Sequence, residues 1–274
     1  MKKINRRSFL AAAGLTAAAL ALTACGGSAS STASSTASSA ASSEAASTSA
    51  AAELTTVEAG KLTMATNAAF PPYEMTTDAG EFEGIDIDTA KAIAEKLGLE
   101  LQIDDMDFDA ALLSVQQGKA DIVMAGVTVT DERKAVMDFS DSYATGIQSI
   151  IVPEGSDITS PDDLAGKKIG TQRGTTGYIY CSDDFGDDAV VAYDDGLTAV
   201  QALKNGQVDA VVIDNAPAKE FVAANPGLVI LDTSYAEEDY AIGLAKGSAL
   251  EDAVNAALEE LKADGTLQSI VDKY

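Results

Sequence analysis

The chain has 274 residues, and its 43 acidic and 18 basic side chains give a formal net charge of −25. An acidic chain of this kind disfavours electrostatic binding to nucleic acid or to an anionic membrane. Histidine is absent and only two cysteines occur, which excludes Ser-His and Cys-His catalytic pairs and the usual imidazole metal sites.

Residues 1–24 have the pattern of a secretory signal peptide, with four basic residues before an apolar run. The run ends Leu-Thr-Ala-Cys-Gly, which resembles a bacterial lipobox. We therefore expect cleavage before Cys25 and a diacylglycerol group on its thiol. An internal membrane helix is the alternative, but the run is too short to span comfortably. The arginine pair at 6–7 also leaves twin-arginine export open.

Residues 25–53 are predicted to be a disordered linker behind the lipidated cysteine. From 26 to 52 the chain is Ser, Thr, Ala and Gly apart from Glu44, and no core can form from that composition. A rigid glycosylated stalk is the alternative. The globular sequence begins near Leu54, and the remaining residues, about 220, suffice for one large domain or two lobes.

Residues 61–66 alternate weakly and predict the first strand, which the segment TNAAFPPYE follows. Its two prolines exclude a helix and favour an extended turn. A loop at the carboxyl end of a strand can present Asn67 and Phe70 to a crevice. Core packing of Phe70 and turn formation by Asn67 are the alternatives.

A hairpin-like turn at 80–84 precedes a helix that we expect to begin at Asp86, as its cap, and to end at Gly98. A strand over 99–103 follows, and then a loop that carries Phe108. The next helix is predicted to run through Gln117.

Residues 122–124 predict a short buried strand, after which Gly126 leaves bare backbone and Thr128 offers a hydroxyl. Thr130 is a good N-cap for a helix that begins with two acids. Arg133 then lies at the start of this helix, where its guanidinium could bind a carboxylate through two parallel hydrogen bonds. The alternative is a surface salt bridge with a nearby acid, Asp131 or Asp138.

The first half of the chain thus alternates strand and helix, which is typical of a parallel sheet. Ligands of such sheets bind at the carboxyl ends of the strands. The three loops described above would bring apolar walls, hydrogen-bonding groups and one cation to the same edge.

After residues 143–147 the chain leaves this unit, and 148–153 predicts the first strand of another. A short capped helix at 160–164 and a strand at 168–171 follow. The loop 172–177 is rich in small residues and opens a helix, whose free N–H groups could bind an anion. A plain capped helix start is the alternative.

Two segments of the chain, 111–126 and 199–214, share a pattern of helix, glycine stop, aspartate and apolar strand. Gly118 matches Gly206, and Asp121 matches Asp209. The repeat predicts two related α/β lobes and places Asp214 just past a strand. A carboxylate buried there is costly unless it meets a cation, although Asp214 could instead cap a helix. Strands at 228–231 and 240–245, an amphipathic helix at 250–263 and a terminal helix complete the chain.

From Lys61 to Tyr274 the chain resembles the family 3 solute-binding proteins of polar amino-acid ABC importers, the glutamine, histidine and arginine group. The resemblance is carried jointly by the segments TNAAFPPYE, EGIDIDTAKAIAEKLG, MDFDAALLSVQQGKADIVMAGVTVTDERKAVMDFSDSY, RGTTG and DAVVIDNAP. It implies an α/β, two-lobed periplasmic-binding-protein-like type II fold with two hinge strands. One lobe would comprise 54–145 plus 240–274, and the other 146–239.

The resemblance also implies a site for a free L-amino acid. Arg133 would hold the α-carboxylate, with the backbone N–H groups of Thr128 and Thr176. Asp214 would hold the α-ammonium, with the Gly126 carbonyl and the Thr128 hydroxyl. The side chain would lie between two aromatic rings, Phe70 and Phe108.

Side-chain specificity is expected to depend on Asn67, where many relatives have aspartate. An amide there favours a neutral polar ligand over a basic one. Gln172 is a further candidate contact to the ligand side chain. Glu74 and Asp107 could still supply negative charge, which leaves arginine and lysine open.

The expected protein is therefore a lipoprotein, held by Cys25 on the extracytoplasmic face of a bacterial membrane, that delivers an amino acid to an ABC permease and its ATPase. We expect a monomer with no cofactor, metal, catalytic residue or nucleic-acid partner. One alternative is a dehydratase-like enzyme on the same fold, which would rely on acid–base chemistry by Glu74, Asp107 or Asp214. Another is a sensory ligand-binding module.

Overall fold

The computed structural model describes residues 54–274, which form one compact unit. The predicted signal peptide, Cys25 and the linker lie outside the described residues. Among residues 54–274, none of the helices combines the length and apolar character needed to cross a membrane.

The first sheet contains three adjacent parallel strands, as the alternation of strands and helices along the chain predicted. Its order is β5 (Glu100–Asp105), β1 (Lys61–Thr66), β6 (Ile122–Val123), β14 (Gly243–Ala245) and β7 (Met137–Phe139). β1 runs parallel to β5 and β6, whereas β14 is antiparallel to β6 and β7. The carboxyl ends of β1, β5 and β6 therefore open toward one edge.

Helices bury this sheet on both faces, so its strands are apolar on both sides. Met64 and Ile122 belong to the core cluster that includes α1 (Ile85–Leu97) and α7 (Glu251–Ala263). The adjacent residues Ala65 and Val123 belong to a separate cluster with α2 (Phe108–Gln116). This division follows the two-residue period of a strand. The short helices α3 (Asp131–Val136) and α8 (Thr266–Val271) complete this part of the chain.

A small antiparallel sheet follows β1 and contains β2 (Ala69–Phe70), β3 (Glu74–Thr76) and β4 (Phe82–Glu83). The next helix begins at Ile85, with Gly84 at its N-cap position. The prediction that Asp86 caps this helix was wrong. Asp86 is fully buried and accepts hydrogen bonds from the Gly126 N–H (3.0 Å) and the Tyr143 hydroxyl (2.8 Å).

The second sheet repeats the plan of the first. Its order is β10 (Val190–Tyr193), β9 (Ile169–Gln172), β11 (Ala210–Asp214), β8 (Ala144–Pro153) and β12 (Leu228–Ile230), and β13 (Ala236–Tyr240) also pairs with β8. β9 is parallel to β10 and β11, and β8 is antiparallel to β11. α4 (Thr176–Phe185) packs on one face, and α5 (Gly196–Lys204) and α6 (Asn215–Ala224) pack on the other.

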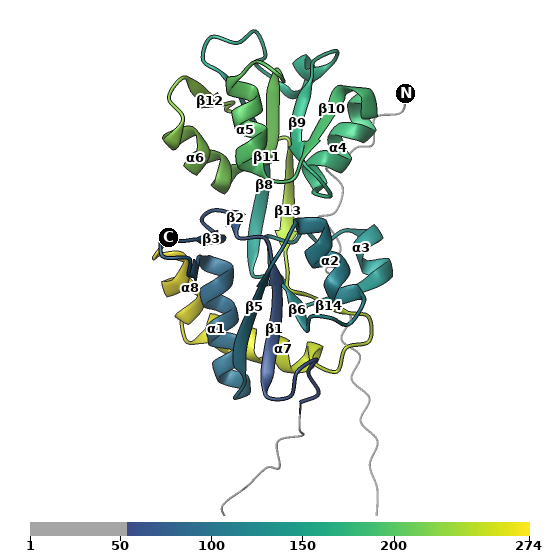
Figure 1. Ribbon diagram of the computed structural model, residues 1–274, viewed down its shortest axis with the longest axis vertical. Helices are drawn as coiled ribbons and strands as arrows, with labels where there is room; N and C mark the ends of the chain where they lie inside the picture. The colour runs from purple at the N-terminus through teal and green to yellow at the C-terminus, as the bar shows by residue number, and fades with distance from the viewer. Residues whose placement is uncertain (1–53) are drawn as a thin grey trace, which may run out of the picture. The chain divides into compact units, whose positions relative to one another are not determined.

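Strands β8 and β13 belong to the second sheet and run side by side from it toward the first (Figure 1), and they are the two hinge strands of a two-lobed fold. Their pairing extends from Ala144 opposite Tyr240 to Gln148 opposite Ala236. Two predictions were wrong here. The break expected near Gln148 is absent because 144–153 is one strand, and the strand expected at 240–245 is divided between β13 and β14.

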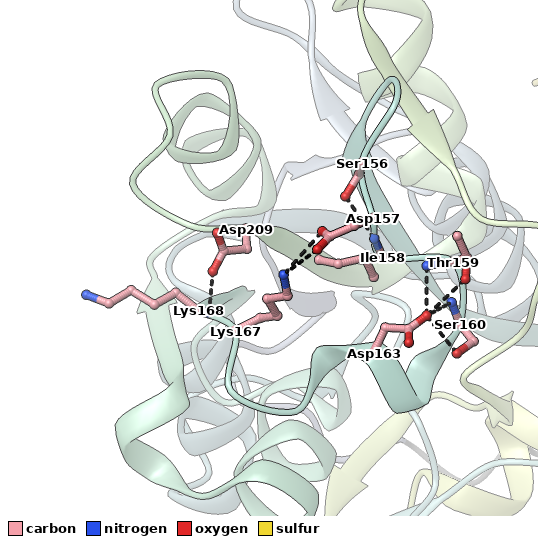
Figure 2. Close-up of polar contacts among 9 residues, drawn as sticks. All are labelled: Ser156, Asp157, Ile158, Thr159, Ser160, Asp163, Lys167, Lys168 and Asp209. Atoms are coloured by element: carbon pink, nitrogen blue, oxygen red, sulfur yellow. Dashed lines mark hydrogen bonds and ion pairs between the residues drawn. The ribbon is translucent and has the colours of Figure 1, made fainter.

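The predicted internal repeat is confirmed in detail. Gly118 and Gly206 both end a helix in the left-handed conformation, with φ of 66° and 67°. Asp121 then accepts a hydrogen bond from the Thr63 N–H, at 2.8 Å. Asp209 accepts the corresponding bond from the Lys168 N–H, at 2.7 Å (Figure 2). In each lobe this aspartate therefore holds the start of one parallel strand against the strand that lies beside it.

The short helix predicted near residue 160 is a 3₁₀ turn, η1 (Pro161–Leu164). Figure 2 shows its cap, in which the Asp163 carboxylate accepts hydrogen bonds from the backbone and hydroxyl of both Thr159 and Ser160. A second 3₁₀ turn, η2 (Asp187–Ala189), precedes β10.

Candidate functional site

One cavity lies where the carboxyl ends of the strands of both sheets meet the hinge. Its free space, part of which is open to solvent, is about 310 Å³. All nine residues predicted to bind a ligand line it: Asn67, Phe70, Phe108, Gly126, Thr128, Arg133, Gln172, Thr176 and Asp214. Glu74, Ala125 and Thr175 complete the lining.

Arg133 enters the cavity from the first turn of α3. Thr130 caps this helix, as predicted, and accepts a hydrogen bond from the Arg133 N–H. The guanidinium is 8% exposed and donates to two carbonyl oxygens, Thr128 O at 2.7 Å and Gly174 O at 3.2 Å. Burial lowers its pKa, yet arginine stays charged at neutral pH.

The surface salt bridge considered for Arg133 does not form. Asp138 pairs with Lys246 instead, at 2.6 Å, and no carboxylate in residues 54–274 lies within ion-pairing distance of Arg133. A guanidinium has five N–H donors, and the two carbonyl bonds leave several of them for a further acceptor. The cavity thus contains a buried cation without a counter-ion from the described chain.

Asp214 ends β11 and faces the same cavity. It stands at the N-cap position of α6, but its side chain makes no capping hydrogen bond. Its carboxylate accepts instead from the Gln148 amide at 2.8 Å and from the Tyr240 hydroxyl. Burial, with a further contribution from Glu238, raises the pKa of Asp214 to about 7. A cation beside this carboxylate would favour its charged form.

A hinge carboxylate that we did not predict orders the hydroxyl groups of the site. Glu238 Oε2 accepts hydrogen bonds from the hydroxyls of Thr128 (3.2 Å) and Thr176 (2.9 Å) and from the Gln148 amide (3.0 Å). An ionised carboxylate only accepts, so each hydroxyl must donate to it. The hydroxyl lone pairs then remain available to another donor.

Aromatic side chains form the apolar walls. Phe70 stacks with Tyr73 at 6.0 Å between ring centroids, and its ring lies so close to Gly126 that a Cβ there would come within 2.9 Å of it. On the other side, the Arg133 guanidinium lies 5.4 Å from the Phe108 ring centroid. This cation–π contact helps to hold both groups in place.

Asn67 and Gln172 form a contact across the cavity. The Gln172 amide donates to the Asn67 side-chain oxygen at 2.9 Å, and the Asn67 amide donates to the Met106 carbonyl at 2.9 Å. Both side chains are therefore largely used by the protein itself. Thr176 lies at the start of α4, behind the Thr175 cap, where first-turn N–H groups have no partner within the helix.

Glu74 and Asp107, the two acids considered for a basic ligand or for acid–base chemistry, differ in position. Glu74 is fully buried and lines the cavity. Asp107 is exposed and is not part of the lining. Residues 54–274 contain no group of three or more metal-ligating side chains arranged to hold a metal ion.

The residues missed from the sequence are Gln148, Glu238 and Tyr240, all on the hinge strands. Glu238 and Tyr240 are buried two positions apart on β13, and residues 237 and 239 are exposed. That alternation is the signal of a half-buried strand. The run of three consecutive acids at 237–239 conceals this alternation, because acidic side chains are mostly exposed.

The sequence matches bacterial extracellular solute-binding proteins, family 3, over residues 62–274. It is 33% identical to a probable histidine-binding protein of Neisseria gonorrhoeae, over 99% of this chain and 96% of that protein. It is 33% identical to the arginine-binding extracellular protein ArtP of Bacillus subtilis, over 78% of this chain and 86% of that protein. The structure is similar to that of an ancestral arginine-binding protein bound to glutamine, with a TM-score of 0.75 and 44% identity over 78% of this chain and 97% of the other.

Proposed function

Because the chain belongs to the bacterial extracellular solute-binding proteins of family 3, we propose that it captures one free L-amino acid between its lobes and delivers it to an ABC importer. The observation that carries this proposal is the presence of Arg133 and Asp214 in the same cavity. Both are buried in one cavity, and neither has an oppositely charged partner within residues 54–274. A zwitterion would supply both missing charges.

Each group of the amino acid would have a defined partner. The α-carboxylate would bind the remaining N–H donors of Arg133 and the backbone N–H groups of Thr128 and Thr176. The α-ammonium would bind Asp214, the Gly126 carbonyl and the Thr128 hydroxyl, whose hydrogen is already directed to Glu238. The side chain would lie between two rings, Phe70 and Phe108.

Binding would proceed by hinge motion about β8 and β13, with lobes comprising 54–145 plus 240–274 and 146–239. Arg133 belongs to one proposed lobe and Asp214 to the other, so only the closed form contacts both ends of the ligand. The ligand would shift the open–closed equilibrium through these differential contacts. The protein would act as a binding protein and not as an enzyme.

The proposed location is the extracytoplasmic face of a bacterial membrane, with a lipid anchor on Cys25 and a flexible linker over 25–53. The lipobox pattern and the family membership support this location. We propose that the protein acts as a monomer and that its partners are an ABC permease and its ATPase.

A thermal-shift screen tests the proposed function. The purified protein is unfolded and refolded to remove any retained ligand, and each common amino acid and cystine is then added. We expect a rise in melting temperature with one or a few of them, and its loss in Arg133→Ala and Asp214→Asn. Arg173→Ala and Asp194→Asn are matched controls, because both side chains are at least half exposed. No shift with any amino acid would refute the proposal.

A further inference from the structure

Two buried acids, Glu74 and Asp86, are in contact beside the ligand cavity. Both side chains are fully buried, and Glu74 also lines the cavity. The two carboxyl groups form a side-chain hydrogen bond with each other. Ionised carboxylates only accept hydrogen bonds, so this bond needs a proton on one of the two residues. The pair therefore holds a proton in the folded protein.

The oxygen atoms of the pair lead to the same result. If both residues were ionised, the two Glu74 oxygens and Asp86 Oδ1 would have no hydrogen-bond donor within residues 54–274. Neither residue belongs to a salt bridge in this part of the chain. Two adjacent ionised carboxylates would also repel each other. One proton between them replaces this repulsion with a hydrogen bond and satisfies one oxygen of each residue.

The neighbouring donors decide which residue carries the proton. Asp86 Oδ2 accepts hydrogen bonds from the Gly126 N–H at 3.0 Å and from the Tyr143 hydroxyl at 2.8 Å. Such bonds favour the ionised form of a carboxylate, and burial raises the pKa of Asp86 only to about 6. Burial, with the negative charge of Asp86, raises the pKa of Glu74 well above its usual range. At neutral pH Glu74 is therefore the neutral acid and donates to Asp86.

The surrounding groups favour this protonated state. Further acids beside Glu74 raise its pKa, and the cation in the cavity forms no ion pair with it. The titratable side chains around the pair are Tyr73, Asp105, Arg133, Tyr143 and Asp214. None of them supplies a counter-ion that would ionise Glu74.

Asp86 connects two segments on which the ligand site depends. Gly126 follows β6 with a φ of 55°, and a Cβ there would come within 2.9 Å of the Phe70 ring and 3.2 Å of the Tyr240 ring. Tyr143 immediately precedes the hinge strand β8, and its N–H donates to the Tyr240 carbonyl at 2.9 Å. The Asp86 carboxylate therefore holds both the backbone of the cavity and the start of the hinge.

We infer that Glu74 is a positioning residue of the ligand site, which donates a retained proton to Asp86 and so keeps that carboxylate on the Gly126 N–H and the Tyr143 hydroxyl. The inference rests on the proposed function for one point, the binding of the ligand ammonium by the Gly126 carbonyl. The retained proton is a property of the ligand-free protein and is tested without a ligand.

The first test follows the side-chain carboxyl carbons of the purified protein by carbon-13 NMR as the pH is varied. Substitution in Glu74→Gln identifies the Glu74 signal by its loss. We expect this signal to have the chemical shift of a protonated acid at neutral pH, where an ordinary glutamate is ionised. Glu81→Gln, which changes an exposed residue of the same hairpin, should leave the signal in place. A Glu74 signal with the shift of an ionised carboxylate at neutral pH would overturn the inference.

The second test measures how the donor at position 74 affects binding, by calorimetric titration with an amino acid that the wild-type protein binds. Glu74→Gln keeps an N–H donor and should bind within about threefold of the wild-type protein. Glu74→Met has a similar length but no donor, which leaves Asp86 Oδ1 buried without a partner. We expect at least about tenfold weaker binding and a displaced Gly126 amide signal in proton–nitrogen NMR. Glu81→Met is the matched control and should change neither.

Normal binding and an unmoved Gly126 signal in Glu74→Met would refute the positioning role. Equal weakening in Glu74→Gln and Glu74→Met would also refute it, because a donor would then not restore the site. If no amino acid binds to the wild-type protein, the proposed function fails, while the Glu74 carbon signal still tests the retained proton. If Glu74→Met does not fold, the wild-type Gly126 amide signal should move at the pH at which Glu74 ionises, and a signal that does not move would refute the role.

Discussion

The side-chain amide of Gln172 donates a 2.9 Å hydrogen bond to the side-chain oxygen of Asn67, and this bond joins the two sheets across the cavity. Gln172 is the last residue of β9, and Asn67 follows β1. A second hydrogen bond also crosses the cavity. It runs from the Arg133 guanidinium on α3 to the Gly174 carbonyl after β9, at 3.2 Å. The protein therefore has contacts that favour closure even without a ligand.

Gln172→Ala should loosen this closure. Loss of one hydrogen bond of about 1 kcal/mol corresponds to about a fivefold change in an equilibrium constant. We expect a larger radius of gyration of the ligand-free protein in small-angle X-ray scattering and about a fivefold weaker ligand affinity. Arg173→Ala, one residue away and exposed, should leave both unchanged. An unchanged radius and affinity in Gln172→Ala would show that this bond does not hold the lobes together.

Gly146→Ala should disturb the hinge. A Cβ at Gly146 would come within 2.4 Å of the Tyr240 ring, and Tyr240 is fully buried. Because the Tyr240 hydroxyl donates to Asp214, displacement of the ring should also disturb the proposed ammonium site. We expect a loss of about 1–3 kcal/mol of unfolding free energy in urea titrations, together with weaker ligand binding. Gly155→Ala has no neighbour within 4 Å but is strained by its φ of +81°, so it tests whether a loss of stability alone weakens binding. If Gly146→Ala bound ligand normally, the ring would not position Asp214.

The ligand-free protein should become less stable as pH rises from about 5 to about 8. Burial raises the pKa of Asp86 to about 6 and, with Glu238, that of Asp214 to about 7; burial and Asp86 also raise the pKa of Glu74. In this range the folded protein therefore keeps protons that the unfolded chain has released, so the free energy of unfolding must fall. We expect a fall of at least about 1 kcal/mol, measured by urea unfolding at a series of pH values.

The Asp214→Asn variant identifies the source of this dependence. In this variant the free energy of unfolding should no longer fall near pH 7. In Asp194→Asn, which changes an exposed residue, the fall should remain. Ligand should remove the Asp214 part of this decrease near pH 7, because an ammonium group favours ionised Asp214 and the folded protein then holds no extra proton there. A ligand-free protein whose stability rises over the same range would contradict the assignment.

The repeated aspartates should differ in their contribution to stability. Asp121 is 6% exposed and accepts two backbone N–H bonds, from Val57 and Thr63, each at 2.8 Å. Asp209 is exposed, and its carboxylate accepts one hydrogen bond, from the Lys168 backbone N–H. We expect Asp121→Ala to cost about 1–3 kcal/mol of unfolding free energy and Asp209→Ala less than about 1 kcal/mol, measured by urea unfolding. Equal effects would contradict this difference and would mean that the single exposed bond of Asp209 stabilises the fold as much as the two bonds of Asp121.

Much of the fold could be predicted from the sequence because the patterns that determine it are local. The first strand lies at 61–66 as predicted, and the glycine and aspartate of each repeat unit occupy equivalent positions in both lobes. The predicted site residues share one cavity because each follows a parallel strand, and the carboxyl ends of such strands meet at one edge. Their contact with a ligand remains a prediction.

The errors arose where distant contacts decide the outcome. Asp86 looks like a helix cap in sequence, but its buried hydrogen bonds come from Gly126 and Tyr143. The continuity of β8 depends on strands β11, β12 and β13 that lie far along the chain. Glu238 resembles a surface acid until the Thr128 and Thr176 hydroxyls are brought to it. No local pattern contains this information.

The most direct test of the central claim is a calorimetric titration of the refolded protein with an amino acid that it binds and with two analogues of that ligand. One analogue lacks the α-carboxylate and the other lacks the α-ammonium. The account predicts one-to-one binding of the intact amino acid and at least about a hundredfold weaker binding of each analogue, because each leaves Arg133 or Asp214 buried without its partner. Analogues that bind as well as the amino acid would contradict the assignment of these two residues to the ends of a zwitterion.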